Sequence, residues 1–143
     1  MTLSTPAGHR ATAKLLKDVR ACELCAAFLP LAPRPVLQVH AHAPILIAGH
    51  APGSKVHQTG IPFDEPSGDR LRDWMGIDKA TFYDETKIAI LPMGFCYPGT
   101  GKSGDLPPLP HPSPRNNIWL KRNDWFEAAV LPSLKRRVQK ILR

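Results

Sequence analysis

The chain has 143 residues, of which 43% are hydrophobic and 22% are charged, and this composition suits one soluble globular domain over residues 1–143. It has no apolar run near the roughly 18 residues of a membrane span and no secretory apolar stretch at its N-terminus, so we expect a cytoplasmic protein without a membrane partner. Nineteen Lys and Arg against twelve Asp and Glu give a formal net charge of +7, which favours nucleic acid as a partner.

The N-terminal part predicts an amphipathic helix followed by an extended connection. Within residues 10–28, apolar side chains recur at helical spacing, at Leu15, Leu16, Val19 and Cys22. We expect this helix to end near Cys25. Residues 29–44 contain four prolines and therefore cannot hold a long helix.

Two short apolar runs predict buried strands of a parallel sheet. The first, residues 45–48, is continuous and rich in β-branched side chains, as expected of a strand buried on both faces, and residues 88–91 have the same character. Each run leads into a loop rich in glycine and proline, over residues 49–53 and 92–99. Ligands bind at the carboxyl ends of the strands in an open α/β sheet, so these loops are expected to border a ligand site.

Helical patterns lie between the strands and at the C-terminus. One helix is expected from about Ser67, which serves as its cap, and its apolar side chains are Leu71, Trp74 and Met75. Residues 99–110 lack periodicity and predict a loop. From Asn123 a near-helical pattern returns, and Pro132 is expected to kink or split that helix. A solvated face there would account for much of the net charge, through Lys135, Arg136, Arg137, Lys140 and Arg143.

Two strands are fewer than a stable doubly wound sheet needs, because a parallel sheet must be covered on both faces. A further strand and helix are expected where the chain passes directly from Pro108 to His111. Without that unit, the edge of the strand at residues 88–91 would lack backbone partners.

Four segments carry a resemblance to one enzyme family. They are GHAPG at residues 49–53, TGIPF at 59–63, SGDRLR at 67–72 and HPSPRN at 111–116. In this order the chain resembles the uracil-DNA glycosylase superfamily over residues 20–130. The first segment is similar to the iron-sulfur family and the last to the single-strand-selective relatives. The resemblance implies a monomer whose fold is a three-layer α/β sandwich with a short parallel sheet, lacking one strand-helix unit.

The resemblance implies a hydrolase of base excision repair, which cleaves the N-glycosidic bond of uracil or a related deaminated base flipped out of DNA. The departing base carries negative charge and the sugar positive charge, so catalysis needs hydrogen-bond donors at the base oxygen more than it needs a nucleophile. In the family pattern His111 supplies that hydrogen bond. Three residues are open as the one that positions the attacking water: His50, Asp64 and Glu65.

A binding site for the flipped base is also implied. Phe63 would stack on the ring, and the backbone near Gly49 and Ala51 would contact the base. Relatives read the uracil edge with an Asn after the second strand, where this chain has residues 91–95 and no Asn. Phe95 is the candidate base-binding residue of that loop.

The last motif is implied to enter the DNA minor groove, with one arginine filling the space left by the flipped nucleotide. Basic residues soon after it lie at distances suited to phosphate contact. The DNA-binding candidates are Ser113, Arg115, Asn116, Lys121 and Arg122. An ordinary surface turn with incidental basic residues is the alternative.

The cysteines form a pair, Cys22-x-x-Cys25, and a distant third, Cys96. In a cytosolic protein such spacing indicates a metal more often than a disulfide. The three match three of the four ligands of the [4Fe-4S] cluster in the iron-sulfur relatives, and the fourth is absent, so the implied ligand set is incomplete. Buried free cysteines are the alternative.

Two other functions stay open at this point. One is a nucleic-acid-binding protein of the same fold with little or no catalysis, which the absent Asn and the missing strand-helix unit favour. The other is a structural domain linked by metal at the cysteines.

Overall fold

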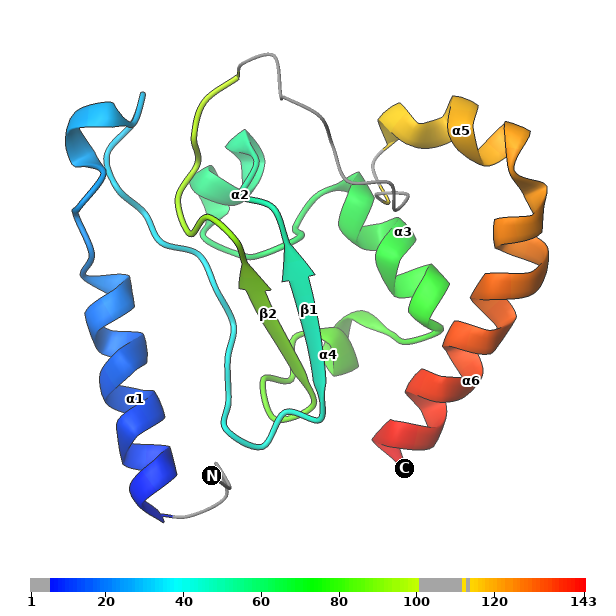
Figure 1. The fold of residues 1–143 in the computed structure, drawn as a ribbon, viewed down its shortest axis with the longest axis horizontal. Helices are drawn as coiled ribbons and strands as arrows, with labels where there is room; N and C mark the ends of the chain where they lie inside the picture. Colours follow the sequence, from blue (N-terminus) through cyan, green and yellow to red (C-terminus); the bar gives the residue numbers. More distant parts are fainter. Residues whose placement is uncertain (1–5, 101–111, 113) are drawn as a thin grey trace.

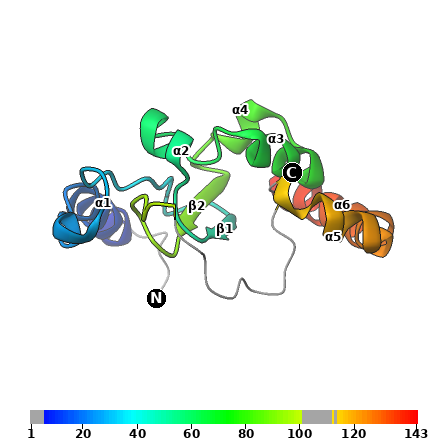
Figure 2. The ribbon, with the colours of Figure 1, turned by 90° about the horizontal axis from the view of Figure 1, so that it is seen from above.

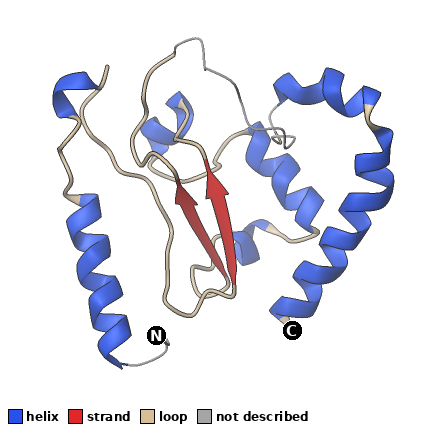
Figure 3. Cartoon of the chain, in the orientation of Figure 1, coloured by secondary structure: helices blue, strands red, loops and turns tan. Residues whose placement is uncertain are grey.

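The computed structural model describes residues 6–100, 112 and 114–143 (Figures 1 and 3). Its α-helices are α1 (Pro6–Arg20), α2 (Ser54–Thr59), α3 (Pro66–Met75), α4 (Lys79–Phe82), α5 (Asn117–Arg122) and α6 (Leu131–Leu142). Its strands are β1 (Ile45–Gly49) and β2 (Ile88–Pro92). Shorter helical segments are η1 (Ala26–Phe28), η2 (Pro114–Asn116) and the π-helical η3 (Phe126–Val130). Over these ranges no helix is both long and apolar enough to cross a bilayer.

The two strands form a parallel sheet, with Ile45 opposite Ile88 and Gly49 opposite Pro92. Parallel neighbours need a crossover connection, which here contains α2, α3 and α4. Seen from above in Figure 2, these three helices lie on the same side of the sheet. In Figure 1, α1 stands beyond β2, and α5 and α6 stand on the side of β1. The predicted α/β class with a short parallel sheet is therefore confirmed.

The strands differ in how they are covered. Ile88, Ala89 and Ile90 are buried, as predicted for the second run, but Leu91, which was predicted to be buried with them, is 37% exposed. In β1, burial alternates, and Leu46 is 61% exposed. The prediction that this strand is buried on both faces is wrong. Only the face with Ile45 and Ile47 packs against the core, and a strand covered on one face shows this alternation.

The edge of β2 is not left open, which corrects the prediction for residues 88–91. Gln38, in the extended connection, forms an antiparallel bridge with Ile90. The Gln38 N–H donates to the Ile90 carbonyl at 3.0 Å and its carbonyl accepts from the Ile90 N–H at 2.6 Å. Its side-chain amide also donates to the carbonyls of Phe82 and Ile88, at 3.0 and 2.8 Å. One residue thus supplies partners that a third strand would otherwise give.

Replacing that residue, Gln38→Ala, should lower the free energy of unfolding by about 1–2 kcal/mol, because two carbonyls of buried residues lose their side-chain donor. Urea denaturation measures this difference. The matched control is Gln139→Ala, on the exposed surface of α6, which should change stability by less than about 0.5 kcal/mol. Equal midpoints for the two variants would show that the amide does not stabilise the sheet edge.

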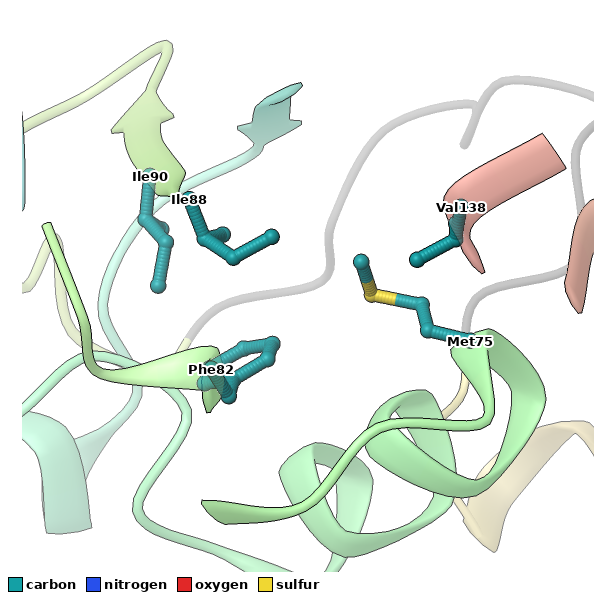
Figure 4. Packing of buried hydrophobic residues seen from close by; sticks show 5 residues of the cluster. All are labelled: Met75, Phe82, Ile88, Ile90 and Val138. Atoms are coloured by element: carbon teal, nitrogen blue, oxygen red, sulfur yellow. The ribbon is translucent and has the colours of Figure 1, made fainter. Parts of the chain in front are cut away.

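The core joins the sheet to the C-terminal helix through α3 and α4. Figure 4 shows Ile88 and Ile90 directed toward Phe82, and Met75 directed toward Val138 of α6. A second cluster fastens the C-terminal helices to α3 and consists of Trp74, Leu120 and Leu131. The last helix therefore takes part in the core that supports β2.

Several predicted helix boundaries need correction. The N-terminal helix ends at Arg20, five residues before Cys25, and contains no buried residue. Helix α3 begins at Pro66, with Glu65 in the N-cap position that had been expected for Ser67, because proline suits the first helical turn. Its predicted core face is confirmed, since Trp74 and Met75 are buried.

The C-terminal pattern from Asn123 forms a π-helical segment followed by one α-helix. Helix α5 ends at Arg122, and a π-helical segment precedes α6, whose first turn contains Pro132. Proline lacks an N–H, so regular α-helical hydrogen bonding cannot run unchanged through that position. The predicted irregularity near Pro132 is confirmed by the π-helical segment that ends at Val130. Helix α5, which precedes the predicted segment, was not expected.

Candidate functional site

A cavity of about 500 Å³ lies where both strands end. Its walls include residues 49–54 after β1, Phe63 and Glu65 from the segment before α3, and residues 97–100 after β2. Arg115, from the far end of the chain, also lines it. The volume lies within the usual range for small-molecule sites, and the position is the one expected of an open α/β sheet.

The two loops at the strand ends are held together by backbone hydrogen bonds. The Met93 N–H donates to the Gly49 carbonyl at 2.8 Å, and the Gly94 N–H donates to the His50 carbonyl at 2.7 Å. These bonds continue the pairing of β1 with β2 beyond the last strand residues. His50 and Ala51 are exposed, and Pro52 is buried beneath them. The GHAPG loop is thus held in place by backbone hydrogen bonds, and the side chains of His50 and Ala51 are exposed at the rim of the cavity.

Phe63 has a strained backbone that a neighbouring glycine makes possible. Its φ is 57°, and within residues 6–100, 112 and 114–143 every other positive φ belongs to a glycine. Such a conformation costs a non-glycine residue about 1–2 kcal/mol. A Cβ at Gly68 would overlap the Phe63 carbonyl oxygen, so only glycine permits this arrangement. The surrounding fold must hold such a strained residue in place. Residues of this kind are found often at binding sites.

The Phe63 ring lies between the cavity and the core. It meets the Phe82 ring edge to face, with centroids 6.1 Å apart. Its far edge is 3.9 Å from where a Cβ of Gly49 would lie. On the preceding residue, the Pro62 carbonyl accepts a hydrogen bond of 2.9 Å from the Tyr83 hydroxyl. Burial raises the pKa of the Tyr83 phenol, with the Arg72 guanidinium opposing it, so this donor keeps its proton at neutral pH.

The two acidic candidates have different surroundings. The Asp64 carboxylate forms an ion pair of 3.5 Å with Lys79 of α4 and is not among the cavity walls. The Glu65 carboxylate does line the cavity, and its Oε1 accepts a hydrogen bond of 2.7 Å from the Ser67 hydroxyl. His50, the third candidate for positioning water, lies at the rim.

The last motif reaches the same cavity in part. His111 and Ser113 lie outside the described residues, and Pro112 between them is buried. Arg115 lies in η2 and lines the cavity, while Asn116 is the N-cap of α5. Further along, Lys121 and Arg122 are exposed in the last turn of that helix. Segments far apart in the sequence therefore meet at one place.

The loop after β2 contributes differently from the prediction. Phe95 is half-buried and is not a cavity wall, and its carbonyl accepts a hydrogen bond of 2.8 Å from the Val36 N–H. The aromatic residue that lines the cavity is Tyr97, two positions later. Sequence reasoning missed Tyr97 and Val36 as cavity residues.

The three cysteines are free thiols, with Cys25 exposed and Cys22 and Cys96 half-buried. Across the described part of the chain, no three His, Cys, Asp or Glu side chains come together as a group that could hold a metal. Four thiolates usually hold a [4Fe-4S] cluster, and the chain has three cysteines, so the ligand set for the implied cluster is incomplete. The cluster stays a prediction, to be tested by iron content and visible absorbance after anaerobic purification.

Comparison with known families gives a match to this region. A family model described as the uracil DNA glycosylase superfamily matches residues 37–108. The matched part contains both strands, the loop at residues 49–54 and Phe63, so it holds most of the cavity.

Proposed function

Because the chain belongs to the uracil-DNA glycosylase superfamily, we propose that it is a DNA glycosylase that hydrolyses the N-glycosidic bond of uracil or a related deaminated base flipped out of DNA. The reaction would release the free base and leave an abasic sugar in the strand. Its place is base excision repair.

The observation that carries this proposal is the meeting of both motifs at one cavity. The GHAPG loop and Phe63 form its walls on one side, and Arg115 lines it from the last motif. A flipped base needs a concave site with an aromatic or apolar surface, and it needs a side chain that takes its place in the duplex. In this chain we propose Phe63 as the aromatic surface for the base and Arg115 as the side chain that takes its place in the duplex.

Cleavage of the N-glycosidic bond requires stabilisation of negative charge on the base and of positive charge on the sugar. As the bond between C1′ and the base nitrogen breaks, its electron pair moves to the base and positive charge develops on the sugar. Hydrogen-bond donors at the base oxygen stabilise the first charge, and His111 is the proposed donor. The backbone near Gly49 and Ala51 is the proposed contact for the base.

A direct assay tests the proposed function. Fluorescent single- and double-stranded oligonucleotides that carry one uracil are incubated with the protein and treated with alkali, which cuts the strand at an abasic site. We expect cleavage at the uracil and none in the matched oligonucleotide with thymine. Tight binding without cleavage would instead favour the nucleic-acid-binding alternative.

For DNA binding, Arg115→Ala should weaken affinity about tenfold, because it removes a cation that would occupy the place of the flipped nucleotide. The slope of log affinity against log salt should also become shallower, by about 1 at most, because one cation fewer displaces counterions from the DNA. Fluorescence anisotropy over a salt series measures both quantities. The matched control is Arg20→Ala at the end of α1, for which parental affinity is expected. Equal losses in the two variants would contradict a specific role for Arg115.

A further inference from the structure

Of the two acidic candidates for positioning water, Glu65 is the one whose side chain lines the cavity. Glu65 precedes α3 as its N-cap, and Pro66 follows it in the first turn. Its carbonyl accepts hydrogen bonds from the N–H groups of Gly68 at 2.8 Å and Asp69 at 3.3 Å. The backbone of this residue is therefore fixed to the beginning of the helix, and its side chain extends away from a rigid point.

Two contacts define where the carboxylate lies. Oε1 accepts a 2.7 Å hydrogen bond from the hydroxyl of Ser67, a side chain that is 4% exposed. Oε2 lies 3.2 Å from the position that a Cβ of Gly53 would occupy, so the carboxylate is close to the last residue of the GHAPG loop. Both residues line the cavity. Glycine at position 53 leaves this approach open.

From this geometry we infer that Glu65 is a catalytic residue of the proposed glycosylase reaction, its carboxylate acting on the attacking water and on the sugar. The inference rests on the proposed function. The negative charge of the Glu65 carboxylate would stabilise positive charge at C1′. An imidazole such as His50 carries no negative charge. Asp64 is negatively charged as well, but it pairs with Lys79 and does not line the cavity.

The proposed step balances in atoms and charge. The water oxygen forms a bond to C1′ as the bond from C1′ to the base nitrogen breaks, and that electron pair leaves with the base. One proton of the water passes to a carboxylate oxygen of Glu65 and is then released to solvent or to the departed base. Ser67 is a positioning residue, because its hydroxyl holds Oε1 and leaves Oε2 toward the loop.

The test uses the full chain and two abasic-site analogues in otherwise identical DNA. One carries a pyrrolidine, whose ring nitrogen is protonated and replaces C1′ with a cation, and the other carries a neutral tetrahydrofuran. Because the phosphates are the same, the ratio of the two dissociation constants reports the effect of the ring charge. We expect the parent chain to bind the cationic analogue about tenfold more tightly or better, and Glu65→Gln to lose this preference.

The matched control is Glu85→Gln, which removes the same charge from an exposed residue in the turn before β2 and should keep the parental ratio. Thermal unfolding should show that Glu65→Gln is folded, since glutamine keeps the shape of the side chain. In single-turnover assays Glu65→Gln should release uracil about 10²-fold more slowly, with little change in affinity for uracil-containing DNA.

Two outcomes would overturn the inference: no preference for the cation in the parent chain, or a preference that survives in Glu65→Gln. Retention of the preference in that variant together with its loss in Asp64→Asn would move the role to Asp64. A parent chain that released no uracil would contradict the proposed function, and the binding ratio would still decide whether Glu65 acts at the sugar position.

Discussion

Gly68→Ala is expected to lower the free energy of unfolding by about 2–3 kcal/mol and to weaken binding at the cavity. The new methyl group would overlap the Phe63 carbonyl oxygen and would lie 2.8 Å from the carbonyl carbon and 2.9 Å from the Cβ of that residue. Backbone atoms cannot rotate away, so either α3 or the strained Phe63 must move. Urea denaturation measures the free energy of unfolding. Fluorescence anisotropy with uracil-containing DNA measures the affinity of binding at the cavity.

The sign of this change is informative, because alanine in a helix is otherwise more stable than glycine by about 1 kcal/mol. An increase in stability for Gly68→Ala would therefore contradict the expected overlap with Phe63. Gly49→Ala is the matched control on the other side of the same ring, where the added carbon would meet the Phe63 ring at an ordinary 3.9 Å. Its stability should stay within about 0.5 kcal/mol of the parent.

His111→Ala is expected to slow uracil release by about 10² or more while DNA affinity changes little. The reason is that a donor aimed at the base oxygen matters chiefly when negative charge develops there, in the transition state, and much less when the base first binds. Single-turnover cleavage and fluorescence anisotropy separate the two effects. His42→Ala, an exposed histidine in the turn before β1, is the control and should cleave at the parental rate.

A His111→Ala variant that cleaves at the parental rate would contradict the assignment of this residue. A variant that loses affinity and rate together would instead indicate a role in binding the base or the DNA.

Both strands could be predicted from the sequence because each is a short apolar run bounded by Pro or Gly and a polar loop. Their coverage could not be predicted, since residues 45–48 look the same whether one face or two is packed. The bridge from Gln38 to Ile90 joins distant parts of the chain and has no local signal. Helices α2 and α4, of six and four residues, are too short for their periodicity to be recognised.

At the site, the loop at residues 49–53, Phe63 and Arg115 were predicted as functional, and the structure brings all three to one cavity. Their roles stay predictions. The difference between Asp64 and Glu65 was beyond sequence reasoning, because it depends on which carboxylate the Lys79 ammonium reaches. The positive φ of Phe63 was equally hidden, because it follows from contact with Gly68 five residues later.

The outer side of β1 has a consequence for how this protein behaves in solution. In the described part of the chain β1 pairs with β2 alone, and its five residues carry no charge and no proline. An edge of this kind is a template for strand addition by another molecule, and Leu46 would be covered in the process. Mutual repulsion from the formal charge of +7 opposes such encounters, and salt screens that repulsion. A higher ionic strength therefore favours self-association of the chain through this edge.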